Sequence, residues 1–188
     1  RVRTRLTVGF GVVCVLLVAS VVMGLMGMGR MGADLKAVVA DHFPRIVAAD
    51  NLSTQIDVIA IALRNMMLNA DAADRERQTQ VIAQSRQEVV RLFDTLDKTL
   101  TEPKDRALLQ KVKEQRALYL AGQEELLGFI KSDQADPSRE YLASKLRPVL
   151  ANYKTAIGAL VESEKNAIVT DGTDARDTAL NARNTLIG

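Results

Sequence analysis

Apolar residues first form one long run and then recur at intervals of three and four. The run covers residues 6–28 and holds no charged side chain. As a helix it rises about 1.5 Å per residue and can cross a hydrocarbon core about 30 Å thick. A cleaved signal peptide would instead have an apolar core of about 7–15 residues and an Ala-x-Ala cleavage site, and the run has neither. We therefore expect a retained transmembrane helix over residues 6–28.

Four later segments carry the spacing of amphipathic helices. Short polar breaks at residues 69–74, 100–105 and 132–138 separate them, and short connections make neighbouring helices antiparallel. An apolar spacing that averages about 3.5 residues is typical of left-handed bundle packing. The pattern predicts an all-α protein, an antiparallel up-down-up-down four-helix bundle that follows one transmembrane helix. The bundle is expected over residues 31–188, with helices at about 34–70, 74–99, 102–132 and 137–186.

Residues at the breaks predict where the helices start. The expected N-caps are Asp71 or Asp74, Thr101 and Asp136, with Pro103 in the first turn of its helix and Pro137 at the first position of the next. Pro148 falls inside the fourth segment, where it removes a backbone donor and crowds the preceding turn. We expect a kink there that follows the curvature of the bundle.

Charge divides the chain at the same place as hydropathy. The first 30 residues carry four arginines and no acid, so residues 31–188 have a net charge of −2 within a chain of net charge +2. The positive-inside rule places residues 1–5 in the cytoplasm and residues 31–188 on the outer side of the membrane. That side is the periplasm if the membrane is the inner membrane of a Gram-negative bacterium. No basic patch with interleaved aromatic residues is present, so nucleic acid is not an expected partner.

The sequence offers little for catalysis or metal binding. His42 is the only histidine and Cys14 the only cysteine, and Cys14 falls in the expected membrane span. No Ser/His/Asp or Cys/His set can be assembled from them. Adjacent acids such as Glu124 and Glu125 are explained by a solvated helix face. We expect no enzyme activity, no metal site and no cofactor.

Polar side chains interrupt the apolar seams at one level of the predicted bundle. In the third segment Arg116, Tyr119 and Gln123 stand on successive rungs of the seam. In the second segment, Arg86 lies where the pattern of large apolar residues is interrupted. In the fourth segment, Tyr153 lies on the seam itself. Counted along the helices from the distal turns, the two arginines and two tyrosines lie roughly 18–24 Å deep. These side chains, from three helices, therefore fall within about one helical turn of each other in depth.

An arginine inside a bundle needs a partner, because an unpaired buried charge is strongly destabilising. Arg116 could pair with an acid such as Asp57, extend from the seam into water, or help to fix the register of the helices. Alternatively, its partner is a carboxylate from outside, which a planar guanidinium binds through two hydrogen bonds. The candidate ligand-binding residues are Arg64, about 10 Å below the distal end of the first segment, and Arg86, Arg116, Tyr119, Gln123 and Tyr153.

The layout resembles the amino-terminal part of bacterial methyl-accepting chemotaxis proteins. The resemblance is carried by RTRLTVGFGVV at residues 3–13, LRNMML at residues 63–68 and LRPVLANYKTAIGALV at residues 146–161. It implies a first membrane span, a four-helix-bundle ligand-binding domain and a homodimer. It also implies a second span and cytoplasmic signalling domains beyond residue 188.

Receptors of this family bind amino acids, di- and tricarboxylates or aromatic acids through arginines of the first helix and polar residues of the third and fourth. Arg64, Arg116, Tyr119 and Tyr153 can be placed on that scheme. The several spaced arginines typical of aspartate receptors are missing from the first helix, which disfavours amino acids as ligands.

We therefore expect a chemoreceptor sensor domain that binds a small organic acid, either a di- or tricarboxylate or an aromatic carboxylate, for chemotaxis. A membrane-anchored structural or protein-docking bundle without a small-molecule ligand is the alternative. The same sensor could also serve a histidine kinase or a cyclase, and it could bind its ligand directly or through a separate binding protein.

Overall fold

The computed structural model describes residues 10–11, 14–15, 17–22 and 41–187, with side chains up to residue 170 and at residue 173. The chain forms two compact units, residues 1–40 with 168–188 and residues 41–167. In the first unit, the described residues between 10 and 22 are helical. Much of the expected transmembrane helix, and residues 34–40 of the first expected bundle helix, lie outside the described residues.

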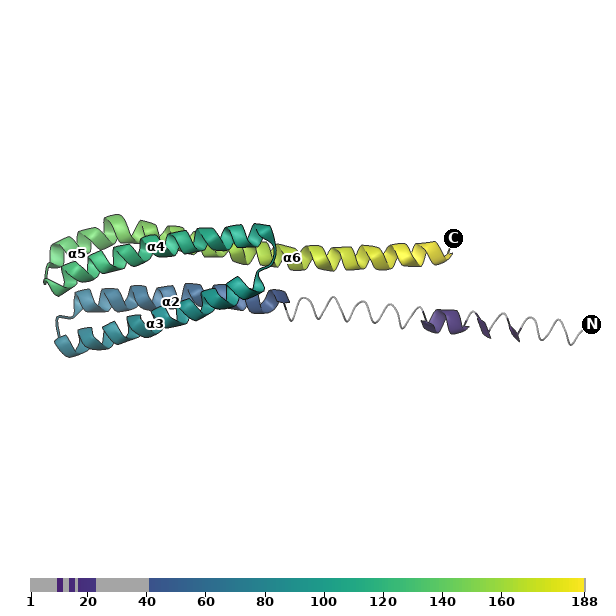
Figure 1. Ribbon diagram of the computed structural model, residues 1–188, viewed down its shortest axis with the longest axis horizontal. Helices are drawn as coiled ribbons and strands as arrows, with labels where there is room; N and C mark the ends of the chain where they lie inside the picture. Colours follow the sequence, from purple (N-terminus) through teal and green to yellow (C-terminus); the bar gives the residue numbers. More distant parts are fainter. Residues whose placement is uncertain (1–9, 12–13, 16, 23–40, 188) are drawn as a thin grey trace, which may run out of the picture. The chain divides into compact units, whose positions relative to one another are not determined.

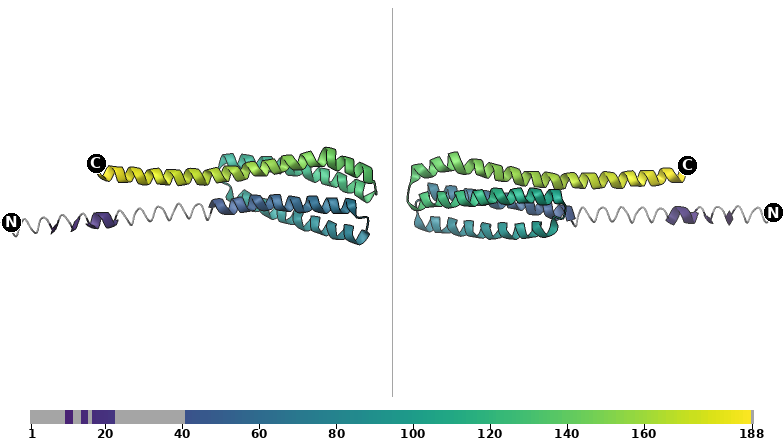
Figure 2. Two further views of the ribbon diagram at one scale, coloured as in Figure 1. Left: turned by 180° about the vertical axis from the view of Figure 1, so that it is seen from behind. Right: turned by 45° about the horizontal axis from the view of Figure 1, so that its top comes forward.

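The second unit is a bundle of antiparallel helices (Figure 1). Its elements are α2 (Phe43–Leu68), α3 (Ala72–Thr99), α4 (Pro103–Lys131), α5 (Ala135–Tyr141), the π-helical turn η2 (Leu142–Leu146) and the part of α6 (Arg147–Ile187) that ends at residue 167. α2 lies beside α3, and α4 lies beside α5 and η2, so the bundle is built from two hairpins (Figure 2). No strand occurs among the described residues. The predicted all-α four-helix bundle is confirmed, with α5, η2 and α6 together forming the fourth helix.

One apolar core runs along the bundle. Its most deeply buried side chains come from all the long helices, among them Leu52 and Ile56 of α2, Leu96 of α3, Leu126 of α4 and Leu160 of α6. Among the described residues, only α2 is long and apolar enough to cross a membrane, with a mean hydropathy of 1.4 over its most apolar stretch. Because 44% of that stretch is buried by the protein itself, we assign these apolar residues to the bundle core.

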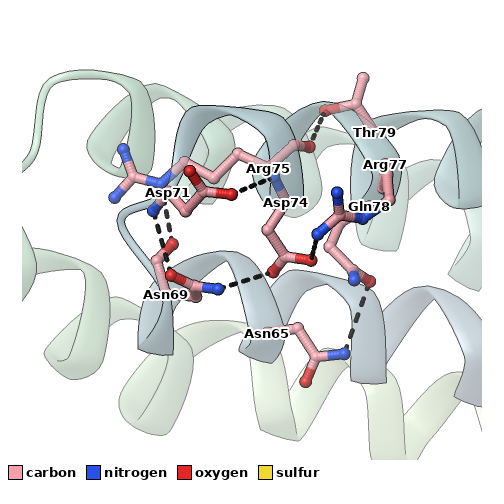
Figure 3. Close-up of polar contacts among 8 residues, drawn as sticks. All are labelled: Asn65, Asn69, Asp71, Asp74, Arg75, Arg77, Gln78 and Thr79. Carbon is pink, nitrogen blue, oxygen red and sulfur yellow. Dashed lines mark hydrogen bonds and ion pairs between the residues drawn. The ribbon is translucent and has the colours of Figure 1, made fainter.

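The turn between α2 and α3 is fixed by hydrogen bonds at both helix ends (Figure 3). Of the two predicted caps, Asp71 is the N-cap of α3, and its Oδ2 accepts from the backbone N–H of Asp74 at 2.9 Å. Arg75 Nε donates to the carbonyl oxygens of Met66 at 3.3 Å and of Asn69 at 3.2 Å, where α2 ends. Side chains at the start of α3 therefore satisfy backbone groups both at the end of α2 and at the start of α3 itself.

The other two predicted N-caps are wrong by one or two positions. α4 has Glu102 rather than Thr101 at its N-cap, and Pro103 is its first residue. Proline suits the first helical position because its ring fixes φ near the helical value, so the residue just before it becomes the cap. α5 has Gln134 at its N-cap. The turn before α5 is shorter than the polar stretch suggested, so Asp136 lies in the first helical turn. Ala135 therefore takes the first helical position that was expected for Pro137.

The fourth helix departs from α-helical geometry just before Pro148. In the π turn Leu142–Leu146, the backbone N–H of the following residue donates to the first carbonyl of the turn. Pro148 has no N–H to donate into the preceding turn, which favours this wider winding. Leu146 packs directly on Gly122 of α4, where an added Cβ would lie only 2.7 Å from Leu146 Cδ1. The structure thus has a π turn just before Pro148, and Leu146 of this turn packs closely on Gly122 of the facing helix. The kink expected at Pro148 stays a prediction.

Candidate functional site

Five of the six predicted site residues surround one small cavity between the two hairpins. The cavity is lined by Ile56 and Ile59 of α2, Arg86 and Val89 of α3, Arg116, Tyr119, Leu120 and Gln123 of α4, and Tyr153 of α6. The depths counted along the helices therefore placed these polar side chains at the right level. The free volume is about 10 Å³, roughly what a single water molecule needs. In this structure the cavity is therefore too small for an organic ligand.

Gln123 and Arg86 bind each other in the lining of this cavity. The guanidinium donates from Nε at 3.1 Å and from Nη2 at 2.7 Å to the same acceptor, Gln123 Oε1. Nη2 of Arg86 also lies 2.8 Å from Glu124 Oε1. Because Gln123 is only 1% exposed, its amide oxygen is held inside the bundle. That oxygen meets the guanidinium fork in the way that a carboxylate oxygen would.

Tyr119 and Tyr153 bring unpaired hydroxyl groups into the core. Their side chains are 2% and 1% exposed, and their ring centroids are 5.9 Å apart with an interplanar angle of 53°. Neither hydroxyl has a hydrogen-bond partner among the described residues; the Gln123 amide lies near Tyr119 without the geometry of a hydrogen bond.

Burial raises the pKa of both tyrosine hydroxyls well above the usual value. The positive charge of Arg64 partly offsets this rise at Tyr119, and that of Arg116 partly offsets it at Tyr153. Both phenols are therefore neutral at physiological pH, so each can donate a hydrogen bond to an anion.

Arg116 has a stacking partner but no acidic partner among the described residues. Its guanidinium lies over the ring of Phe93, with Cζ 5.1 Å from the ring centroid, a favourable cation–π contact. Among the described residues no carboxylate pairs with Arg116. Asp57, considered from the sequence as its possible partner, instead accepts from Lys154 Nζ at 2.9 and 2.8 Å. That pairing alternative for Arg116 is wrong, because Asp57 is already neutralised by a lysine of α6.

Arg64 is the predicted site residue that does not line the first cavity. It lies exposed on α2 and lines a second cavity of about 10 Å³ with Ala60, Leu63, Tyr119, Leu142, Leu146, Arg147 and Leu150. Tyr119 is the one residue that lines both cavities. The sequence pattern did not single out Arg147. The π turn adds one residue to its winding, so it rotates the helix beyond it by about 100° relative to an α-helix.

A second polar cluster lies toward the other end of the bundle, and the sequence pattern did not reveal it either. Glu164 of α6 is 1% exposed; its Oε2 lies 2.8 Å from His42 Nδ1 and 3.7 Å from Arg45 Nη1. Its Oε1 and the Nε of Arg45 have no hydrogen-bond partner among the described residues. Apolar residues become less frequent in this part of the sequence, so the spacing alone assigns Glu164 to the polar face of the helix.

The chemistry of the first cavity suits the binding of an anion. Two guanidinium groups, two neutral phenols and an amide face an otherwise apolar wall. None of these groups forms a nucleophile–base pair of the kind that covalent catalysis requires. Within the described part of the chain, no group of three or more His, Cys, Asp or Glu side chains could hold a metal ion.

Comparison with known proteins assigns the chain to a family. No curated protein matched the sequence. A family model described as a four helix bundle sensory module for signal transduction matches residues 1–179. The match spans nearly the whole chain and agrees with the two-hairpin bundle and with the resemblance noted in the sequence. The chain therefore belongs to the four-helix-bundle sensory modules of methyl-accepting chemotaxis proteins, a family of signalling rather than catalytic domains.

Proposed function

We propose that this chain is the sensor domain of a chemoreceptor that binds a small organic acid between its two helical hairpins and is not an enzyme. The observation that carries the proposal is the pair of buried tyrosine hydroxyls without hydrogen-bond partners, beside Arg116, which has no acidic partner among the described residues. A buried unpaired hydroxyl costs about 1–3 kcal/mol. A carboxylate in the cavity accepts from these hydroxyls and from the guanidinium together.

Binding must open the site, because about 10 Å³ is too small for any organic acid. The incoming carboxylate displaces the Gln123 oxygen from Arg86 and separates α3 and α4 locally. Tyr153 on α6 forms part of the same wall, so the change also moves α6 relative to α2. This displacement is the signal that passes along α6 toward the membrane.

The proposed topology follows from the charge distribution. Residues 1–5 lie in the cytoplasm, residues 6–28 span the bacterial inner membrane, and residues 31–188 lie in the periplasm. A second membrane span connects the sensor to cytoplasmic signalling domains, and these domains bind the cytoplasmic signalling partners. A chemotaxis output is favoured over a histidine kinase or a cyclase by the family to which the module belongs.

The receptor works as a homodimer in this proposal. Exposed apolar side chains on one face of α2, namely Phe43, Val47, Ile61 and Leu68, support such a contact. Ile61→Lys should convert a dimer to a monomer in light scattering of the full chain in detergent micelles. Leu118→Lys, at an equally exposed leucine of α4, should leave the dimer intact. A dimer unaffected by Ile61→Lys would contradict this interface.

A structural or protein-docking bundle without a small-molecule ligand is the second candidate. The closed cavity favours it, since a purely structural bundle needs no space for a ligand. Isothermal titration calorimetry of the full chain in detergent micelles with malate, citrate, benzoate and aspartate separates the two. Binding of an organic acid supports the sensor, and the absence of binding to every acid refutes it.

The site assignment is tested in the same titrations. Arg116→Ala should weaken binding of the acid by about tenfold or more, since a hydrogen bond to a charged group contributes about 1.5–3 kcal/mol. Arg106→Ala removes an exposed arginine of the same helix that lies outside the cavity and should bind as the unmodified chain does. Equal affinity of Arg116→Ala and the unmodified chain would refute the assignment.

A further inference from the structure

A third cavity lies at the junction of the two hairpins. Residues 100–102 connect α3 to α4 and so join the hairpins (Figure 1). The cavity beside this turn is lined by Asp97 and Leu100 from the α3 end and by Arg106, Leu109, Gln110 and Lys113 of α4. Its free volume is about 180 Å³, whereas the two cavities beside Tyr119 have about 10 Å³ each. A cavity of about 150 Å³ can hold benzene, so this one has room for a small ligand without any opening of the bundle.

Three hydrogen-bond donors follow one face of α4 along this cavity. Arg106, Gln110 and Lys113 are four and three residues apart, so they lie on the same side of the helix. Arg106 is exposed, and its guanidinium has no acidic partner among the described residues. The two leucines of the lining are nearly fully buried and form its floor. A cationic fork, an amide and an ammonium group therefore stand together over an apolar floor, as an anion site requires.

Asp97 faces these donors from α3. Lys113 Nζ donates to its two carboxylate oxygens at 2.6 and 2.8 Å, which leaves at least one of the three ammonium N–H groups without an acceptor in this pair. Their side chains are 46% and 36% exposed. Such exposed pairs contribute little to stability because water and salt screen them, so Lys113 can turn to an anion at small cost. Two cations against one acid give the lining a net charge of +1.

The carboxylate of Asp97 also selects among anions. It has only acceptors, so it repels an anion unless that anion brings an O–H group that donates to it. Hydrogen phosphate carries such a group, whereas sulfate and the phosphodiester of a lipid headgroup do not. The remaining phosphate oxygens point in separate directions and can accept from several donors at once. An organic acid is better suited to the first cavity, whose wall is mainly apolar.

We propose that the cavity between Asp97 and Arg106 is a binding site for inorganic hydrogen phosphate. Arg106, Gln110 and Lys113 donate to its oxygens, and Asp97 accepts a hydrogen bond from its O–H group. The bound anion bridges α3 and α4 and so holds the two hairpins together where the chain joins them. This inference is independent of the proposed organic-acid function, because the two cavities share no residue.

Isothermal titration calorimetry of the full chain in detergent micelles tests the site with phosphate, sulfate and dimethyl phosphate, in a buffer that contains none of them. Phosphate should bind at least about threefold more tightly than the other two, since one additional hydrogen bond provides roughly that factor. It should also raise Tm, because a ligand that binds only the folded chain stabilises it. No binding of phosphate would refute the site. Sulfate binding as tightly as phosphate would refute the selection by Asp97, and equally tight dimethyl phosphate would assign the site to a lipid headgroup instead.

Arg106→Ala separates this site from the first cavity. It should weaken phosphate binding about tenfold and leave the organic acid unaffected, whereas Arg116→Ala should do the reverse. Failure of either site therefore leaves the other standing. Lys104→Ala is the matched control, because Lys104 is an exposed cation of the same helix that does not line the cavity. Equal losses of phosphate affinity in Arg106→Ala and Lys104→Ala would reflect the general charge of α4 and overturn the site.

Asp97→Asn tests the selectivity for phosphate. It removes a negative charge and supplies an amide donor, so sulfate should bind at least about threefold more tightly than it does to the unmodified chain, and the preference for phosphate should disappear. Asp94→Asn makes the same charge change at an exposed acid of α3 that pairs with Lys98 and does not line the cavity. This control should keep the phosphate-to-sulfate ratio. A ratio that Asp97→Asn leaves unchanged would overturn the role of Asp97.

Discussion

The two unpaired tyrosine hydroxyls predict that removing a polar group stabilises this protein. Tyr119→Phe and Tyr153→Phe each delete one buried oxygen and keep the ring. The ring pair at 5.9 Å and its packing are retained, so neither variant creates a sizeable void. What changes in the folded state is the loss of a hydroxyl that is buried without a hydrogen-bond partner among the described residues.

The size of the effect follows from the desolvation of that hydroxyl. In the unfolded chain the hydroxyl binds water, and in the folded chain it loses this hydration without compensation, at about 1–3 kcal/mol. Taking the lower end, each variant should gain about 1 kcal/mol, which raises Tm by about 2–4 °C for a domain of this size. The two sites are in contact, so the gain of the double variant need not be the sum of the single gains.

Thermal denaturation followed by far-ultraviolet circular dichroism checks this prediction. Tyr141→Phe is the control, because Tyr141 is only half-buried and its hydroxyl is not among the unsatisfied groups. In calorimetry, the two site variants should also bind the acid about tenfold more weakly, so stability and affinity move in opposite directions. A lower Tm in Tyr119→Phe and Tyr153→Phe would show that the hydroxyls already have good partners, and it would remove the reason to assign them to a ligand.

Three further predictions concern stability. Gly122→Ala should lower the free energy of unfolding by about 1 kcal/mol, because crowding against Leu146 outweighs the gain in helix propensity. Gly128→Ala, with no atom near the added Cβ, should raise the free energy of unfolding by about 0.5–1 kcal/mol; urea denaturation measures both. A stabilised Gly122→Ala would contradict the close packing. Asp71→Ala should cost about 1 kcal/mol through the lost cap on the Asp74 N–H, with Asp71→Asn nearly neutral; equal losses in both would mean that the cap is not the cause. Burial raises the pKa of the two site tyrosines in the folded chain, so above about pH 10 the same tyrosines ionise first in the unfolded chain. The free energy of unfolding should therefore fall by up to about 1.4 kcal/mol per pH unit for each tyrosine. Replacing both by phenylalanine should flatten that alkaline decline, and an unchanged slope would refute the burial argument.

The sequence by itself determined the architecture and the level of the site. Apolar residues three and four apart specify amphipathic helices, and short polar breaks require neighbouring helices to be antiparallel. Depth along a straight helix needs only the rise per residue, so residue counting alone places Arg86, Arg116 and Tyr153 at one level of the bundle. Asp71 could be named as a possible cap because capping depends on local residues alone.

The tertiary structure decided which way each side chain faces and what it contacts. Gln123 accepts hydrogen bonds from Nε and Nη2 of Arg86, a contact that depends on the distance between α3 and α4. The π turn, set against Gly122, places Arg147 beside the cavity that Arg64 lines. Glu164 is buried by contacts made far away in the sequence. These features depend on helix rotation and separation, which are fixed by the packing of all the helices together and not by the spacing of residues along any one of them.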